Sequence, residues 1–206
     1  MIIHQIFLDF GLKPLSERED WLENIRINKE LNPNHTFKLW TDVEINDLID
    51  SDYPHYKEII SEFPHRWYLV DFARYLILCK EGGMYMDLDL RCKQELPECE
   101  FVLGDSYTKR GVNGNVIKLS QEHNKGLLEF CVSEIKRIKD NNLYAKWKGR
   151  HLFNTVASYM FRRYCKRNEI KSDIVFHDYF LDGEAGSWID LGITKHYFKK
   201  TTEGKY

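Results

Sequence analysis

Apolar runs alternate with amphipathic stretches along the first half of this chain. Ile2–Leu8 and Thr36–Trp40 are rich in β-branched, aromatic and other apolar residues, which is typical of buried strands. Between them, Pro14–Leu31 repeats apolar positions at helical spacing, and Asn32-Pro33-Asn34 marks a turn. Strands that alternate with helices in this way predict an α/β fold whose sheet contains parallel strands.

The pattern predicts further elements after Trp40, and Thr41-Asp42 is a suitable N-cap for the first of them. Helices are predicted at Val43–Ile49, Trp67–Lys80, Gly126–Lys139 and Leu152–Arg167. Strands are predicted at Met84–Leu90, Phe101–Leu103, Asn115–Lys118 and Ile174–His177, and the tail from Phe180 is predicted to be a loop. Because no repeat or linker interrupts the pattern, residues 1–206 are predicted to form one domain.

The segment Trp67–Cys79 is apolar almost throughout, apart from Asp71 and Arg74. These two residues are three positions apart, so a helix places them on one face. That face either looks into a cavity or holds an internal ion pair that fixes the packing. Gly82-Gly83 then supplies a helix stop, since glycine adopts positive φ at little cost.

Asp87 and Asp89 follow on the predicted strand Met84–Leu90. Side chains of a strand alternate between its two faces, so both carboxylates and Tyr85 are expected to project together, opposite the apolar face. Two buried like charges are unfavourable without a compensating cation or donor cluster. The pair therefore predicts a metal site.

Composition narrows the classes of function. The 206 residues are 43% hydrophobic and 14% aromatic, which fits a globular protein, and a net charge of −2 gives no general reason to expect nucleic acid as a partner. The five cysteines are odd in number and form no CxxC pair, so we expect a reducing compartment. Without a visible signal peptide or transmembrane segment, the expected location is cytoplasmic, with peripheral recruitment to a membrane if the protein acts there.

Two longer motifs resemble the signature of the DXD sugar-transferase family, which includes Golgi mannosyltransferases, capsular-polysaccharide transferases and, more distantly, glucosylating toxins. The motifs are Asp71-Phe72-Ala73-Arg74-Tyr75 and Gly82-Gly83-Met84-Tyr85-Met86-Asp87-Leu88-Asp89, with Val70 where the family usually has Ser. Weaker matches are Ile2–Phe7 at the start, Leu39–Asp42 after the second strand, and Ile193–His196 near the end.

This resemblance implies a GT-A fold, with a mixed central sheet flanked by helices. It also implies a glycosyltransferase that moves a hexose-type sugar from a UDP- or GDP-sugar to a glycan, glycoprotein or glycolipid acceptor. Mn²⁺ or Mg²⁺ is the implied cofactor, because a divalent cation offsets the charge that builds up on a leaving diphosphate. Relatives generally retain the anomeric configuration, so retention is expected here.

The resemblance also suggests residue roles. Asp89 is expected to be the main metal ligand, and Asp87 to be shared between the metal and the donor. Asp71 and Arg74 are expected to hydrogen-bond the donor sugar, with Tyr75 beside them in the signature.

Other expected roles come from the two ends of the chain and its middle. The backbone at Gln5, Ile6 and Phe7 is expected to meet the nucleobase, and His196 to be a third metal ligand or a diphosphate contact. Asp105 is a catalytic candidate, and with Asp182 and Glu184 it is a candidate base if the reaction inverts the anomeric centre. Trp40 is either a base-stacking or a core residue.

Some features depart from the family pattern or leave alternatives open. The Ser-Trp that relatives carry after the late histidine is Thr201-Thr202 here, unless Ser187-Trp188 takes its place. A nucleotide-sugar or metal-binding module without activity remains an alternative. So does a haloacid-dehalogenase-like phosphatase with Asp87 as nucleophile, although Leu90-Arg91 does not fit that motif.

Overall fold

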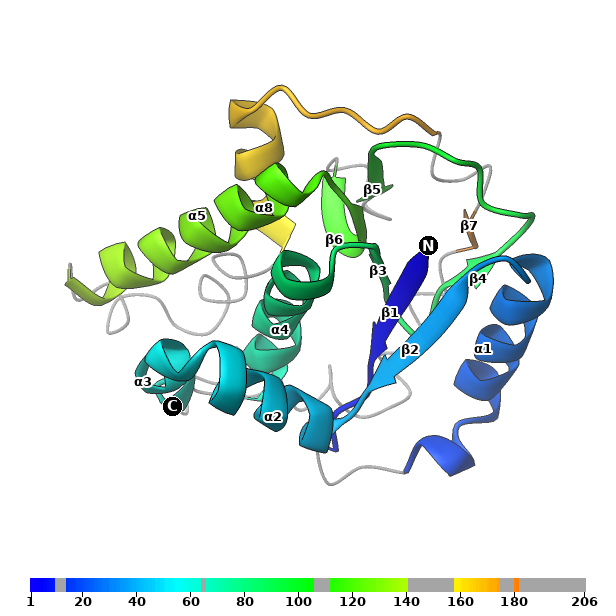
Figure 1. Cartoon of the computed structure of the whole chain (residues 1–206), viewed down its shortest axis with the longest axis horizontal. Coiled ribbons are helices and arrows are strands. Elements are labelled where there is room, and N and C mark those ends of the chain that lie inside the picture. The colour runs from blue at the N-terminus through cyan, green and yellow to red at the C-terminus, as the bar shows by residue number, and fades with distance from the viewer. Residues whose placement is uncertain (10–13, 64–65, 106–111, 141–157, 175–179, 182–206) are drawn as a thin grey trace, which may run out of the picture.

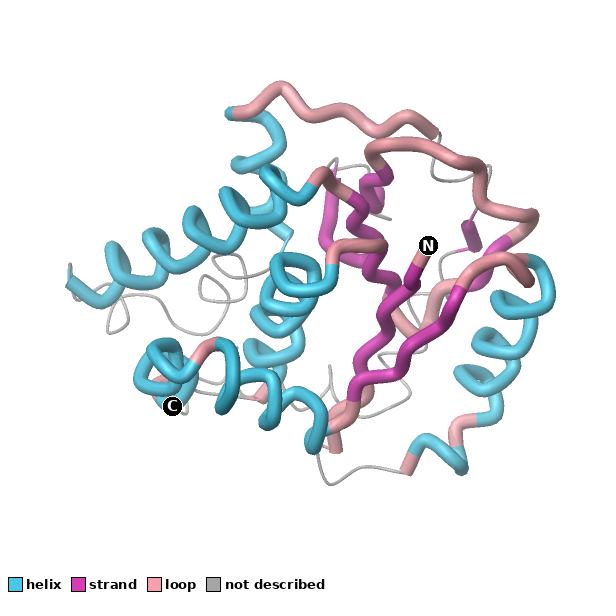
Figure 2. Tube along the Cα trace, viewed as in Figure 1, coloured by secondary structure: helices cyan, strands magenta, loops and turns pink. Residues whose placement is uncertain are grey.

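The structure is a computed structural model, and it describes residues 1–9, 14–63, 66–105, 112–140, 158–174 and 180–181. A five-stranded mixed sheet forms its centre, with strand order β2-β1-β3-β6-β5 (Figures 1 and 2). β1 pairs in parallel with β2 and β3, whereas β6 pairs antiparallel with β3 and β5. The strands are β1 (Ile2–Ile6), β2 (Thr36–Trp40), β3 (Met84–Met86), β5 (Val102–Asp105) and β6 (Val112–Lys118).

Helices cover both faces of this sheet (Figure 1). One face packs in a large core with residues of α2, α4, α5 and α8, and the other packs with residue 31 of α1 and the segment 90–96. β4 and β7 form a separate two-stranded sheet. The bounds are η1 (Leu15–Glu17), α1 (Glu19–Leu31), α2 (Asp42–Asp52), η2 (Pro54–Tyr56), α3 (Lys57–Ser61), α4 (Trp67–Glu81), β4 (Arg91–Cys92), α5 (Gln121–Asp140), α8 (Ser158–Arg167) and β7 (Phe180–Leu181).

The order of the parallel strands creates a topological switch point. The chain leaves β1, passes through α1 and adds β2 on one side, then passes through α2, α3 and α4 and adds β3 on the other side. Connections therefore diverge at the carboxyl ends of β1 and β3. In open α/β sheets, ligands bind in the crevice outside such a point. The strand order therefore predicts a ligand crevice beside the residues that follow Ile6 and Met86.

α4 is the central helix predicted by the sequence, and Gly82 and Gly83 end it as expected. Both glycines have positive φ, +69° and +76°. A Cβ on Gly83 would lie only 2.5 Å from the Ile2 carbonyl oxygen, so the turn passes too close to β1 for any side chain. The helix is buried along most of its length, and it carries the ion pair Asp71–Arg74 in its N-terminal half.

A second buried polar group ties the other end of α4 to the sheet. Trp40 Nε1 donates to His4 Nδ1 at 3.1 Å, so the imidazole proton lies on Nε2, 3.1 Å from the Gly82 carbonyl oxygen. Burial lowers the pKa of His4 to about 4, which keeps the ring neutral. Trp40 is buried here, and of its two predicted roles the structure supports the core role.

Most predicted elements are present, but two predictions are wrong. The strand predicted over Met84–Leu90 ends at Met86, because the backbone N–H of Leu90 turns back to the Asp87 carbonyl at 3.2 Å. Phe180, predicted to begin a loop, pairs with Cys92 as part of β7. The predicted strand Ile174–His177 lies almost wholly outside the described residues, and the single-domain assignment stays a prediction.

Candidate functional site

Four polar side chains meet at the carboxyl end of β3. Arg74 Nη2 lies 2.5 Å from Asp71 Oδ1 and 3.9 Å from Asp87 Oδ1. The Tyr85 hydroxyl donates to Asp87 Oδ1 at 2.5 Å. The sequence correctly placed Asp71 beside Arg74 and Tyr85 beside Asp87. The structure adds that the helix pair and the strand pair are one cluster.

Arg74 is the only cation of this cluster among the described residues. Its Nη1 donates to the Gly114 carbonyl of β6, and its guanidinium lies 4.6 Å from the centre of the Tyr85 ring. Its Nε has no hydrogen-bond acceptor among the described atoms, although it is buried. The guanidinium is thus fixed from two sides, and its Nε–H remains for a further partner.

The two carboxylates of the cluster are incompletely neutralised. Burial raises the pKa of Asp71 to about 6, against the attraction of Arg74 and with the help of repulsion from Asp87. Burial also raises the pKa of Asp87, while Arg74 and the Tyr85 hydroxyl oppose the change. Two carboxylates therefore share one guanidinium, which leaves one excess negative charge in a buried place.

Residues 87–90 form a turn, so Asp87 and Asp89 do not share the face of a strand as predicted. The Asp87 N–H donates to the Asn115 carbonyl at 2.8 Å, which anchors the start of the turn to β6. Asp89 is buried in the same turn, with 6% of its surface exposed. The carboxylates thus sit in the connection at the end of β3, where the strand order places a ligand crevice.

This donor set fits a divalent cation. Hard cations such as Mg²⁺ and Mn²⁺ prefer carboxylate oxygens, and a cation here would neutralise the excess charge beside Asp87. Among the described residues, no three His, Cys, Asp or Glu side chains are grouped closely enough to form a metal centre by themselves. His196, the predicted third ligand, lies outside the described residues. A nucleotide diphosphate normally supplies further oxygens to such an ion.

Residues 18–109 match a family described as the glycosyltransferase sugar-binding region containing the DXD motif. The matched residues include both motifs, from Asp71 to Asp89. The chain is 31% identical over 124 residues to inositol phosphoceramide mannosyltransferase 3 of Schizosaccharomyces pombe, covering 59% of this chain and 33% of that protein. It is 32% identical over 95 residues to mannosyl phosphorylinositol ceramide synthase CSH1 of Saccharomyces cerevisiae, covering 46% and 24%. The chain thus spans at most about a third of the length of these relatives.

The fold has a counterpart among solved structures. A PaToxG glycosyltransferase superposes with a TM-score of 0.60 at 12% identity, covering 99% of this chain and 76% of that one. At this identity the likeness concerns the fold. Together with the mixed five-stranded sheet, it confirms the GT-A prediction.

The predicted base-binding residues lie at the carboxyl end of β1, before the matched residues 18–109. Phe7 follows the strand, its N–H donates to the Trp40 carbonyl at 2.9 Å, and its ring lies edge-on to Trp21 at 6.1 Å. Ile6 is part of the core. Gln5 is buried, and its Nε2 has no acceptor among the described atoms. The backbone at Gln5–Phe7 therefore borders the switch point, and its role in base binding stays a prediction.

The remaining predicted site residues are less closely tied to the cluster. Tyr75 of α4 is buried in the core, although it is next to Arg74 in the chain. Asp105 ends β5 and pairs through its backbone with Val112, and its side chain is outside the described part of the structure. Their roles in binding and catalysis stay predictions.

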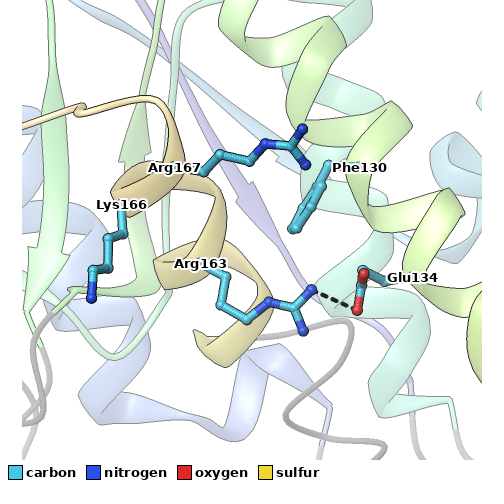
Figure 3. A pocket seen from close by; sticks show the side chains of 5 residues that line it. All are labelled: Phe130, Glu134, Arg163, Lys166 and Arg167. Atoms are coloured by element: carbon cyan, nitrogen blue, oxygen red, sulfur yellow. Dashed lines mark ion pairs between the residues drawn. The ribbon is translucent and has the colours of Figure 1, made fainter.

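An open hollow of about 510 Å³ lies elsewhere, between α5 and α8 (Figure 3). Its one carboxylate, Glu134, already pairs with Arg163 at 2.6 Å and with Arg137 at 3.0 Å. Lys166, Arg167 and Phe130 complete the lining. A carboxylate held by two arginines is a poor ligand for a divalent cation, so the cluster at β3 is the better candidate for a metal site.

The sequence interpretation missed one group near the motif. Asn24 of α1 donates to the Leu88 carbonyl, between the two aspartates, at 3.3 Å. Asn28 and Asn32 follow it at intervals of four and are also buried. Asparagine repeated at helical spacing on the core side of a helix was the available signal.

Proposed function

We propose that this chain is a metal-dependent glycosyltransferase that moves a hexose-type sugar from a nucleoside-diphosphate sugar to a hydroxyl acceptor with retention. The observation that carries the proposal is the pair of carboxylates, Asp71 and Asp87, that share the guanidinium of Arg74 beside the DXD turn. A structural ion pair would be balanced, whereas this cluster has one negative charge in excess. The family match of residues 18–109 supports the same chemistry.

The proposed roles are those that the resemblance suggests, and the cluster at β3 supports them. Asp89 and Asp87 would hold Mn²⁺ or Mg²⁺, with His196 as a further ligand. When bound, the cation supplies Lewis-acid stabilisation of the leaving diphosphate. Asp71 would accept hydrogen bonds from the donor sugar, and the spare Nε–H of Arg74 would donate one, which fixes the anomeric carbon for reaction.

The acceptor end of the reaction follows from retention. The acceptor hydroxyl would attack from the side of the leaving group and pass its proton to a diphosphate oxygen, so no strong protein base is required. Asp105 is the proposed catalytic carboxylate near this end, and Gln5, Ile6 and Phe7 would receive the base of a UDP- or GDP-sugar. Tyr75 would support the donor site from the core.

The relatives suggest which substrates to test first. They are named for transfer of mannose to inositol phosphoceramide, so we propose GDP-mannose as the first donor and an inositol-containing glycolipid as the first acceptor. Glycans and glycoproteins are the next acceptors. No helix of the described residues has the length and apolarity needed to cross a membrane, and a cytoplasmic location stays a prediction.

The test is a panel of UDP- and GDP-sugars with the purified protein, Mn²⁺ and no acceptor. We expect slow hydrolysis of one donor that stops in EDTA and returns with Mn²⁺, and the same donor should raise the unfolding temperature by mass action. Adding the correct acceptor should convert hydrolysis into transfer. Cleavage of a phosphomonoester instead would support the phosphatase. A raised unfolding temperature without turnover of any donor would support the binding module.

A further inference from the structure

One face of α1 carries three asparagines at intervals of four, namely Asn24, Asn28 and Asn32, the last of which caps the helix. All three are buried, with 7%, 0% and 1% of their surfaces exposed. A buried amide is costly unless its polar atoms are hydrogen-bonded. The partners of these amides therefore explain why the helix carries them.

The partners lie in the chain that follows the DXD motif. Asn28 Nδ2 donates to the Leu90 carbonyl at 2.9 Å, and its Oδ1 accepts from the Cys92 N–H at 2.7 Å. Further along, Asn32 Oδ1 accepts from the Leu96 N–H at 2.8 Å. Successive turns of α1 thus hold successive parts of the segment 88–96.

Asn24 occupies the end of this series that reaches the motif. Its Nδ2 donates to the Leu88 carbonyl, which belongs to the peptide group that joins Leu88 to Asp89. The Arg91 Nε–H donates to Asn24 Oδ1 at 2.9 Å, so both ends of the amide are engaged and its orientation is defined. The Leu88 carbonyl cannot rotate without breaking this bond, and the backbone of Asp89 is fixed with it.

We infer that Asn24 is a positioning residue for the metal-binding turn. It holds the Leu88–Asp89 peptide, and with it the backbone of Asp89, in one orientation, and it does not itself contact the metal or the donor. This inference rests on the proposed function, because it assumes that the turn binds a metal–diphosphate. Residues that orient metal ligands in this way typically change metal affinity by about 10–100-fold.

Asn32 provides the matched control. Both residues are buried asparagines of α1 that bond the same segment, but the bond of Asn32 is at Leu96, seven residues beyond Asp89. We would measure the binding of Mn²⁺ in the presence of UDP or GDP by electron paramagnetic resonance, together with urea unfolding. Asn24→Ala should weaken Mn²⁺ binding by about 10-fold or more. Asn32→Ala should stay within about two-fold of the wild type, even where its loss of stability is similar.

Asn24→Leu is a second variant of similar volume in case Asn24→Ala does not fold, and it should show the same loss of affinity. Wild-type affinity in a folded Asn24 variant would overturn the inference and leave the proposed function intact. Equal weakening by Asn32→Ala would also overturn it, because general loosening of the segment would then explain the effect. If the wild type bound neither Mn²⁺–UDP nor Mn²⁺–GDP, the proposed function would fall and the inference with it.

Discussion

The chain contains two Asp-x-Asp triplets, and their surroundings differ. Asp50-Ser51-Asp52 ends α2 on an exposed surface, where Asp50 pairs with Lys57 at 2.9 Å and Asp52 pairs with Lys80. Asp87-Leu88-Asp89 lies in a buried turn, where Asp87 shares Arg74 with Asp71. In the first triplet each carboxylate has its own lysine. In the second, the negative charge exceeds the positive charge.

This difference shows that an Asp-x-Asp sequence alone does not define a metal site. An exposed carboxylate with a lysine partner is stable in water and has little to gain from a metal. A buried carboxylate that shares its guanidinium partner with a second carboxylate is stabilised strongly by a bound metal ion. Burial, a shared guanidinium and a position at the end of β3 distinguish Asp87-Leu88-Asp89 from Asp50-Ser51-Asp52.

The largest expected difference is in donor turnover, between a variant of the buried triplet and a variant of the exposed one. Asp89→Ala should reduce Mn²⁺-dependent turnover of the donor by at least about 10³-fold, because it would remove the proposed main ligand of a charge-stabilising ion. Asp52→Ala should leave turnover within about two-fold of the wild type, because Asp52 lies on the surface and its partner is Lys80. Turnover is measured with labelled donor, and circular dichroism checks that both variants fold. Unchanged turnover in Asp89→Ala would remove the metal assignment.

The cation of the buried cluster is the next target. Arg74→Leu should destabilise the protein by about 3–5 kcal/mol, because Asp71 and Asp87 would be left buried without their partner. The double variant Arg74→Leu/Asp87→Asn should recover part of this loss, since one of the stranded charges is gone. Urea unfolding in metal-free buffer measures the stability of the double variant and of each single variant. If the double variant were as unstable as the sum of the two single changes, the shared compensation would be disproved.

Proton linkage gives a third test, in which two buried groups act in opposite directions. The pKa of Asp71 is raised to about 6, so its contribution to stability falls as the pH rises from about 4 to 6. The pKa of His4 is lowered to about 4, so its contribution is lost as the pH falls from 6.5 toward 4. Each shift corresponds to about 3 kcal/mol, and the two largely cancel in the wild type.

Asp71→Asn should therefore expose the dependence that His4 produces. Between pH 4 and 6.5, the free energy of unfolding should climb more steeply in this variant than in the wild type, by about 3 kcal/mol over the window. The measurement is urea unfolding at half-unit pH steps with EDTA present. Parallel curves for the two proteins would show that Asp71 titrates normally and that its carboxylate is already compensated.

The local elements of this fold were predictable, and the geometry of the motif was not. α4 was predicted because an apolar segment with one ion pair and a Gly-Gly stop is a local pattern. The turn after Met86 was missed because residues 87–90 alternate polar and apolar just as a strand does. Its shape depends on a bond from Asn24, which is 64 positions from Leu88, and the asparagine repeat of α1 does not reveal which segment it bonds. His196 and the side chain of Asp105 stay predictions from the resemblance.

The smallest expected effect is a change in the pKa of Asp52, in the exposed triplet, when salt is added. The hydrogen bond from Lys80, helped by one from Ser51, lowers the pKa of Asp52, whereas burial raises the pKa of Asp87. Because surface charges are screened by salt, 1 M NaCl should return the pKa of Asp52 toward its ordinary value and leave that of Asp71 near 6. Carboxyl carbon shifts in a pH titration by nuclear magnetic resonance would follow both residues. Lys80→Ala should reproduce the effect of salt on Asp52 alone. A salt-sensitive Asp71 would mean that the cluster at β3 is open to solvent, which would remove the difference in burial between this cluster and the exposed triplet.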